Sequence, residues 1–210
     1  MKASPSLTAI SLATLGTGAL AAADSGIADF IAKIRSEDDK VRGPAWQGAG
    51  PLGAPAVAPL AEAMTATDFE IARSAKRAIE RIVRHAGRPA ADAERKAVQA
   101  ELVKLLKAGS VNVRRHALWM LSEIGDDDAV APMAALLPDA EARDDARCSL
   151  ERIPGAKATT ALKQGMAAAP EDFKFALAHS LRVRGEKVSG YPSQKLLPTK
   201  KTSVGTEDGK

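Results

Sequence analysis

The residue types that could carry chemistry in this chain are few and widely spaced. Its three histidines, His85, His116 and His179, lie at separations that match no metal-ligand spacing. We predict that all three are partly exposed surface residues. The single cysteine, Cys148, excludes an intramolecular disulfide and a cysteine-rich metal site. We expect it to be a small, partly buried apolar residue.

The acidic run Asp126-Asp127-Asp128 is a possible group of cation ligands. A calcium loop needs spaced oxygen ligands and a terminal bidentate glutamate, and that spacing is absent. Acidic residues at helix starts stabilise the helix dipole, so we interpret this run as structural. The sequence contains no glycine-rich phosphate loop and no nucleophile elbow. It therefore predicts no catalytic activity, no cofactor and no metal.

Three residues are candidates for binding a partner. Trp119 lies about 140° around its predicted helix from the centre of the apolar stripe, which places it at a repeat edge or on the surface. There it either anchors a partner or packs against the neighbouring repeat. Arg88 belongs to the irregular Pro-Gly loop His85–Pro89, where repeat proteins often carry specificity. Tyr191, in the C-terminal segment, is the third candidate.

The composition indicates which elements position these residues. Alanine, the best helix former, dominates the apolar residues, and aromatics make up only 3% of the chain, so an all-α fold is favoured. The net charge of +4 is a mild excess, whereas nucleic-acid binders concentrate a stronger one. We therefore predict no nucleic-acid partner.

Internal repeats organise the chain. In the clearest copy, Val113, Ala117, Met120, Leu121 and Ile124 recur at helical spacing and form one apolar stripe. A lone helix could not bury this stripe, so neighbouring copies must stack. Subtraction gives intervals of 30, 42, 29 and 31 residues between equivalent positions, and an insertion around residues 85–92 explains the long one. These positions are Ala49, Ile79, Leu121, Leu150 and Leu181.

The third copy carries a family resemblance. Val113-Arg114-Arg115, the stretch Leu121–Asp126 and Ala129-Val130-Ala131-Pro132-Met133 resemble the short bacterial HEAT repeats of the phycobilisome-lyase-like class. The resemblance implies a right-handed α-solenoid of about five two-helix repeats, with the last repeat incomplete. The first copy departs from the pattern because Gly43 and Pro44 are poor in a helix interior, so that unit is expected to be kinked or to act as a cap.

Polar residues predict where the repeats begin and how they stack. Thr67–Glu70 fits a capping box, Ser36–Asp39 is a similar arrangement, and Ser110 and Asp139 are candidate N-caps. Basic residues just after the valine-equivalent position would face acidic or polar residues of adjacent repeats, in a ladder that fixes the register. The basic members are Arg42, Arg114, Arg143 and Lys174, and the others are Glu70, Asn112, Glu141 and Asp172.

The chain ends complete the prediction. Residues 1–23 have the basic start, apolar core and small-x-small cleavage site of a signal peptide, so the mature chain would begin at Asp24. The solenoid then spans 24–185, an extended segment caps it over 186–199, and 200–210 form a disordered tail. We predict a periplasmic or secreted scaffold that does not span a membrane and binds a protein or peptide. The alternative is an accessory or lyase-like factor acting on a partner protein.

Overall fold

The computed structural model describes residues 25–193, and every regular element in this range is helical, which confirms the all-α prediction. A first helix covers residues 25–34. The predicted signal peptide, residues 194–199 and the predicted tail lie outside the described residues. The other elements are α2 (Asp39–Gln47), η1 (Gly50–Leu52), η2 (Ala54–Ala56), α3 (Val57–Ala63), α4 (Phe69–Ala86), α5 (Asp92–Leu105), α6 (Val111–Ile124), α7 (Asp127–Ala134), α8 (Arg143–Arg152), α9 (Ala156–Ala168) and α10 (Glu171–Val183).

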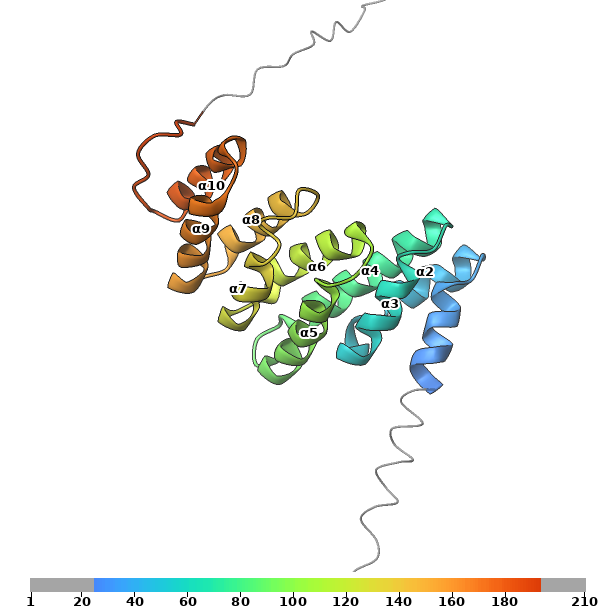
Figure 1. Ribbon diagram of the computed structural model, residues 1–210. Helices are drawn as coiled ribbons and strands as arrows, with labels where there is room; N and C mark the ends of the chain where they lie inside the picture. The colour runs from blue at the N-terminus through green and yellow to red at the C-terminus, as the bar shows by residue number, and fades with distance from the viewer. Residues whose placement is uncertain (1–24, 194–210) are drawn as a thin grey trace, which may run out of the picture.

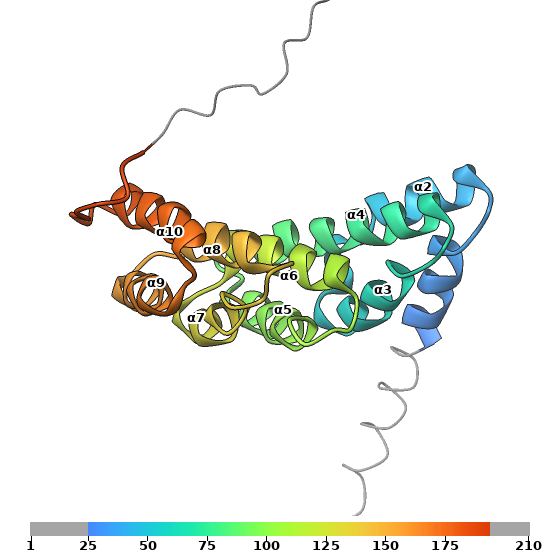
Figure 2. The ribbon, with the colours of Figure 1, turned by 45° about the horizontal axis from the view of Figure 1, so that its top comes forward.

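The helices stack in two rows, as the prediction of an α-solenoid requires (Figure 1). The even-numbered helices α2, α4, α6, α8 and α10 lie side by side in one row. The odd-numbered helices α3, α5, α7 and α9 form the other row (Figure 2). The predicted repeats correspond to α2–α3, α4–α5, α6–α7 and α8–α9, followed by α10 alone. The array is bowed, and the even-numbered row lies on its hollow side, called the concave face below (Figure 2).

One continuous apolar core fills the space between the rows. All five residues of the predicted stripe in α6 are buried, and Leu118 beside them is buried as well. In α4 the equivalent residues Ala75, Ile79 and Ile82 are fully buried. Alanines between the branched side chains let neighbouring helices approach closely, because they add little volume. Stacking of the repeats therefore buries stripes that no single helix could bury alone.

Acidic side chains cap several helix starts. The Asp68 carboxylate accepts hydrogen bonds from the backbone amides of Glu70 and Ile71, so the N-cap of α4 is Asp68 and not Thr67 as the capping box predicts. In the run at 126–128, Asp126 caps α7 by accepting from the amide of Asp128. Asp126 therefore has a structural role as a helix cap, as the sequence predicts for this acidic run.

The first unit is irregular at the predicted place. Pro44 lies inside α2, and the chain then passes through η1 and η2 before α3 begins. Trp46 packs against the core, with the guanidinium groups of Arg77 and Arg81 lying 5.1 Å and 5.7 Å from its ring centroid. Close packing favours glycine at position 50, because a β-carbon there would lie 3.1 Å from the Cβ atom of His85 and that side chain would have to shift.

The long interval between the second and third repeats has two structural causes. Helix α4 has 18 residues, whereas α6 has 14, so part of the extra length continues the helix. The rest forms the loop 87–91, in which Ala90 takes a left-handed backbone conformation with φ of 62°. The insertion predicted around residues 85–92 therefore begins as additional helix and only then becomes a loop.

The predicted charge ladder forms at two of its steps. The Arg114 guanidinium lies 3.1 Å from the Asp139 carboxylate and 3.8 Å from that of Glu141, and Arg143 lies 3.1 Å from Asp172. At the other two positions the prediction is wrong. Arg42 pairs with Asp39, and Lys174 pairs with Glu171, each within its own helix, because an acid three residues earlier is nearer.

The chain beyond α10 folds back on that helix. Val188 packs against the core, and the Tyr191 ring meets the Phe175 ring edge to face at a centroid distance of 5.2 Å. Arg182 donates from Nη2 to the carbonyl oxygens of Gly190 and Tyr191. Residues 187–193 therefore lie against α10, the helix that has no partner following it in the described part of the chain.

Candidate binding groove

A groove of about 730 Å³ opens between α4 and α6 and reaches α8. The even-numbered helices that form it lie on the concave face (Figure 2). Its residues come from the surface positions of these helices and from the turn before α4, because the stripe positions point into the core. The lining residues are Met64, Phe69, Ala72, Arg73, Lys76, Glu80, Asn112, Arg115, His116, Trp119 and Asp145.

Two exposed aromatic side chains mark this groove. Phe69, the first residue of α4, is 71% exposed, and Trp119 of α6 is 46% exposed. The Arg152 guanidinium of α8 lies 4.7 Å from the Trp119 ring centroid, so the next repeat holds the indole in place. Trp119 therefore contacts the neighbouring repeat, as one of the two interpretations from the sequence expects, and it still presents a large apolar surface.

His116 forms part of the groove wall and corrects the sequence-based expectation. It is only 7% exposed, whereas we expected a surface residue. Burial, with a smaller contribution from the Lys76 charge, lowers the pKa of His116 to about 4. Its Nε2 atom is buried and has no hydrogen-bond partner among the described residues. His116 lies three residues after Val113 and four before Met120, at the edge of the apolar stripe, and its polar ring was the reason to expect it at the surface.

Each wall of the groove carries charges of both signs. On the α6 side, Arg115 donates from Nε to the Asp145 carboxylate of α8 over 2.6 Å, which neutralises both groups. On the α4 side, Arg73 pairs with Glu70 and lies over the Phe69 ring. The α4 wall also carries Lys76, which is exposed and forms no ion pair with any carboxylate of residues 25–193. Glu80 lines the same wall, so basic and acidic groups balance on both sides of the groove.

The three predicted binding residues do not form a single site. Trp119 lines the groove. Arg88 lies in the loop after α4, where it donates two hydrogen bonds to the Glu94 carboxylate and thereby lowers the pKa of Glu94. Tyr191 lies against α10, and a side-chain hydrogen bond with Glu171 raises its pKa. Arg88 is thus occupied by an ion pair, and Tyr191 belongs to the C-terminal segment.

Of the eleven lining residues, sequence reasoning singled out only Trp119 as a binding residue, and those it missed include Phe69, Lys76 and His116. Phe69 carried a usable signal, because a phenylalanine directly after an N-cap and outside the apolar stripe has no place in the core. Lys76 carried only a weak sequence signal, since lysine is common at surface positions of a helix. His116 carried a partial signal, because its spacing of three from Val113 and four from Met120 places it at the edge of the apolar stripe.

A second, smaller hollow of about 470 Å³ lies between α7 and α9, in the other row. Its walls are small or flexible side chains, and no aromatic ring is among them: Val130, Ala131, Ala134, Ala156, Lys157, Thr160, Ala161 and Gln164. Over residues 25–193, no group of histidine, cysteine and acidic residues is arranged to hold a metal ion. No helix in the same range has the length and hydropathy needed to cross a membrane.

A bowed, two-row array of paired helices with a lined hollow on one face defines the class of α-solenoid repeat proteins. The family model for HEAT repeats matches residues 76–151 and 100–182, which together cover just over half of the 210-residue chain. The chain therefore belongs to the HEAT-repeat family.

Several solved structures are similar to the chain, and a comparison with curated proteins gives no match. An engineered protein is 21% identical over 80% of this chain and 84% of its own, with a TM-score of 0.40. A designed armadillo repeat protein in complex with the peptide (KR)4 is 18% identical over 76% and 82%, with a TM-score of 0.45. A second engineered protein is 20% identical over 76% and 48%, with a TM-score of 0.39.

Proposed function

We propose that this chain is an exported, non-catalytic scaffold that binds a segment of a protein or peptide partner in the concave groove. The observation that carries the proposal is the paired exposure of Phe69 and Trp119 beside a groove large enough to take side chains. Exposing aromatic surface costs free energy in water, and binding a partner recovers it. Tryptophan is also among the residues that most often dominate binding energy at interfaces.

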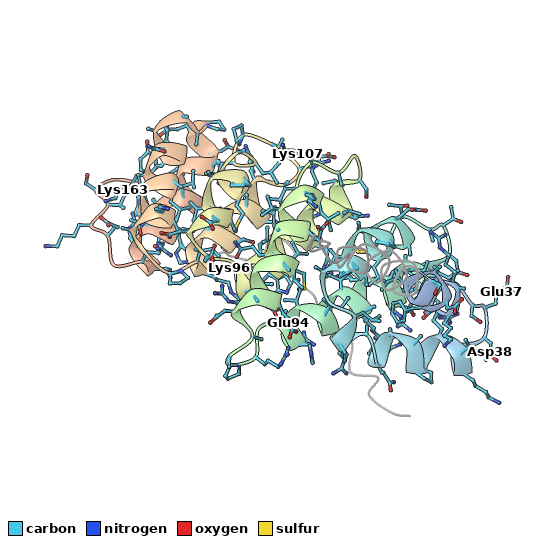
Figure 3. All side chains as sticks on the ribbon, turned by 90° about the horizontal axis from the view of Figure 1, so that it is seen from below. Glu37, Asp38, Glu94, Lys96, Lys107 and Lys163 are labelled. Carbon is cyan, nitrogen blue, oxygen red and sulfur yellow. The ribbon has the colours of Figure 1, made fainter. Side chains whose placement is uncertain are left out.

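A site-specific crosslinking experiment tests the groove. A photo-crosslinkable phenylalanine analogue replaces Trp119 in one variant and Lys107, an exposed residue after α5 labelled in Figure 3, in a matched control. In cells of the source organism, the variant at Trp119 is expected to form a discrete adduct with a partner protein, and the control is expected to form none. Equal adducts from both positions, or none from the groove position, would contradict the proposal.

Export is the second part of the proposal and rests on residues 1–23. The sequence there has a basic start, an apolar stretch and small residues at Ala21 and Ala23, which together fit recognition and cleavage by a signal peptidase. We expect the mature chain in the periplasm or medium to begin at Asp24. Cell fractionation followed by N-terminal sequencing tests this, and an intact Met1 on protein confined to the cytoplasm would contradict it.

The phycobilisome-lyase-like class of short HEAT repeats suggests a finer alternative, an accessory or lyase-like factor. The Val113–Asp126 pattern supports that subclass in the sequence. A scaffold is expected to purify colourless and without a bound chromophore, whereas a stoichiometric chromophore would favour the accessory role. An absorbance spectrum of the protein purified from its source separates the two.

A further inference from the structure

Three arginines lie in a row along the side of α4 that is nearest α2, outside the groove. Arg77, Arg81 and Arg84 follow one another at intervals of four and three residues, which places them on successive turns of one helix face. Arg81 and Arg84 are exposed, and Arg77 is half-buried. None of the three belongs to the groove lining. They are called the arginine row below.

Trp46 of α2 holds two of these arginines in place. The guanidinium groups of Arg77 and Arg81 lie 5.1 Å and 5.7 Å from its ring centroid, and the ring itself packs against the core. A cation over an aromatic ring is attracted to it and keeps its charge and its N–H donors. Both guanidinium groups are therefore positioned before a ligand arrives, which lowers the entropic cost of binding one.

No acidic side chain of residues 25–193 neutralises the arginine row. Arg77, Arg81 and Arg84 form neither an ion pair nor a hydrogen bond within this range. The adjacent part of the first repeat supplies no acid, because residues 43–61 contain no charged side chain. Glu80 is the one acid among residues 71–86, and it lines the groove instead.

The later steps of the even-numbered row are different, because basic side chains there meet an acid of the next helix. Arg115 of α6 pairs with Asp145 of α8, and Arg143 of α8 pairs with Asp172 of α10. Such pairs neutralise charge where two repeats stack. The step from α2 to α4 therefore has a surplus of positive charge that the stacking of the repeats does not use.

The arginine row lies on the concave face, next to the groove. By the interval of 42 residues between Ile79 and Leu121, Arg77 occupies in α4 the position that Trp119 occupies in α6. Both helices belong to the row on the hollow side of the array (Figure 2). A flat membrane or a stiff nucleic-acid duplex does not follow the inside of a bowed array, whereas a flexible peptide segment does.

We propose that the arginine row is a second binding surface, which takes a short acidic segment of a protein partner. The planar guanidinium group pairs with a carboxylate through two parallel hydrogen bonds, and charges on successive turns suit a run of acidic side chains. Charge complementarity of this kind favours an acidic partner over a basic or neutral one. The inference rests on the proposed function for the class of partner, but its residues are separate from the groove.

Tryptophan fluorescence locates the binding, because the chain has only two tryptophans. Trp119→Phe leaves Trp46 as the reporter, and Trp46→Phe leaves Trp119. Each full-length variant is titrated with an acetylated octaglutamate peptide and with a neutral glycine–serine peptide of equal length. Only octaglutamate is expected to change the emission, and only that of Trp46, because carboxylates that bind Arg77 and Arg81 alter the electrostatic field at its ring.

Anisotropy of fluorescein-labelled octaglutamate measures the contribution of charge. Arg84→Glu alters an exposed arginine that does not contact Trp46, and Lys107→Glu, also exposed, is the control with the same change in net charge. Arg84→Glu is expected to weaken binding by about tenfold or more, and Lys107→Glu is expected to bind like the wild type. Added salt is expected to lower the wild-type affinity. Thermal melts verify that each variant is folded.

Several outcomes would overturn the inference. Equal losses in Arg84→Glu and Lys107→Glu would mean a general attraction by net charge. A change in the emission of Trp119 instead of Trp46 would move the site to the groove. Absence of octaglutamate binding would also overturn it, even if Arg84→Glu lost binding to a DNA duplex or to phosphatidylglycerol vesicles. The adduct formed from Trp119 in the crosslinking experiment judges the proposed function separately.

Discussion

The two hollows of this solenoid have a common origin and different surfaces. Each lies between stacked helices of one row, the larger between α4 and α6 and the smaller between α7 and α9. The first exposes two aromatic rings, whereas the second is lined mostly by alanine, threonine and glutamine side chains. A hollow alone therefore does not identify a binding site, because stacking of repeats produces hollows with large and with small lining residues alike.

The side chains, and not the volume, distinguish a candidate binding surface. Small polar and alanine side chains lose little when they face water, so the α7–α9 hollow needs no partner to explain it. Phe69 and Trp119 leave large apolar surfaces in water, at a cost of about 25 cal/mol for each Å² of apolar area. The comparison predicts that core substitutions in the two rows will have similar effects on stability at neutral pH, and that surface substitutions in the two hollows will have unequal effects on binding.

The largest expected effect tests whether the same core supports both hollows. Leu121 of α6 and Leu162 of α9 are both fully buried, one in each row. We expect Leu121→Ala and Leu162→Ala each to lower the free energy of unfolding by about 2–5 kcal/mol, because each leaves a cavity in the core. Urea denaturation followed by circular dichroism measures this. A much smaller cost for Leu162→Ala would show that the odd-numbered row is less firmly packed than its burial indicates.

The next effect is specific to the α4–α6 groove, because only this hollow has a buried titratable side chain in its lining. The pKa of His116 is lowered to about 4, so the folded state resists protonation while the unfolded state binds a proton near the ordinary value of about 6.5. The folded protein is therefore unaffected by this group above about pH 6.5 and loses stability as the pH falls toward 4. The loss is expected to reach about 3 kcal/mol.

Denaturant titrations at pH 7 and at about pH 4 compare the wild type with His116→Gln. The variant is expected to lose less stability on acidification, because its side chain does not titrate in this range. Exposed His179 provides the matched control, and His179→Gln is expected to follow the wild type. An unchanged pH dependence in His116→Gln would mean that the imidazole accepts a proton in the folded state without penalty.

A third prediction separates the two surfaces by binding. We expect Trp119→Ser to weaken partner binding by about 2 kcal/mol, roughly thirtyfold, since a central exposed aromatic often dominates an interface. Gln164→Ser, in the smaller hollow, is expected to leave affinity unchanged. Titration of the crosslinked partner, once purified, against both variants measures the difference. Equal losses would remove the distinction between the hollows.

The fold could be predicted from the sequence, whereas the site could be predicted only in part. Apolar stripes such as Val113–Ile124 and their intervals were sufficient for a stacked helical array, because burial requires neighbours. Trp119 was found because its angle around the helix lies outside the stripe. His116 was expected at the surface because its side chain is polar. Helical spacing places it only at the edge of the stripe, and the packing of α4 against α6 decides that this edge is buried.

Local competition explains the other errors. Asp68 replaces Thr67 as the N-cap because its carboxylate reaches two backbone amides. In the ladder, Arg42 is drawn to Asp39 within its own helix. A pattern aligned between repeats cannot foresee such pairs, since an acid three residues away competes with the acid of the next repeat. Where that nearer acid is absent, as before Arg114, the pair between repeats forms.

The smallest effect concerns the ion pairs that hold the helices of the concave face in register. Arg114 donates to the carbonyl oxygens of Ala108 and Gly109 as well as to the Asp139 carboxylate, and its side chain is mostly buried. We expect Arg114→Ala to lower the free energy of unfolding by about 1–2 kcal/mol, because two carbonyls and a carboxylate lose their donor. Arg143→Ala, which breaks a more exposed pair with Asp172, is expected to cost less than about 1 kcal/mol.

Thermal and urea denaturation of both variants, with Arg114→Lys as the charge-conserving control, tests this difference. Lysine keeps the positive charge but cannot bond two carbonyls and a carboxylate at once, so Arg114→Lys is expected to fall between the wild type and Arg114→Ala. If Arg114→Ala left both stability and the spacing of α6 and α8 unchanged, the ion pairs between repeats would not be needed to fix the register of the helices. The shape of the groove wall would then depend on the apolar core alone.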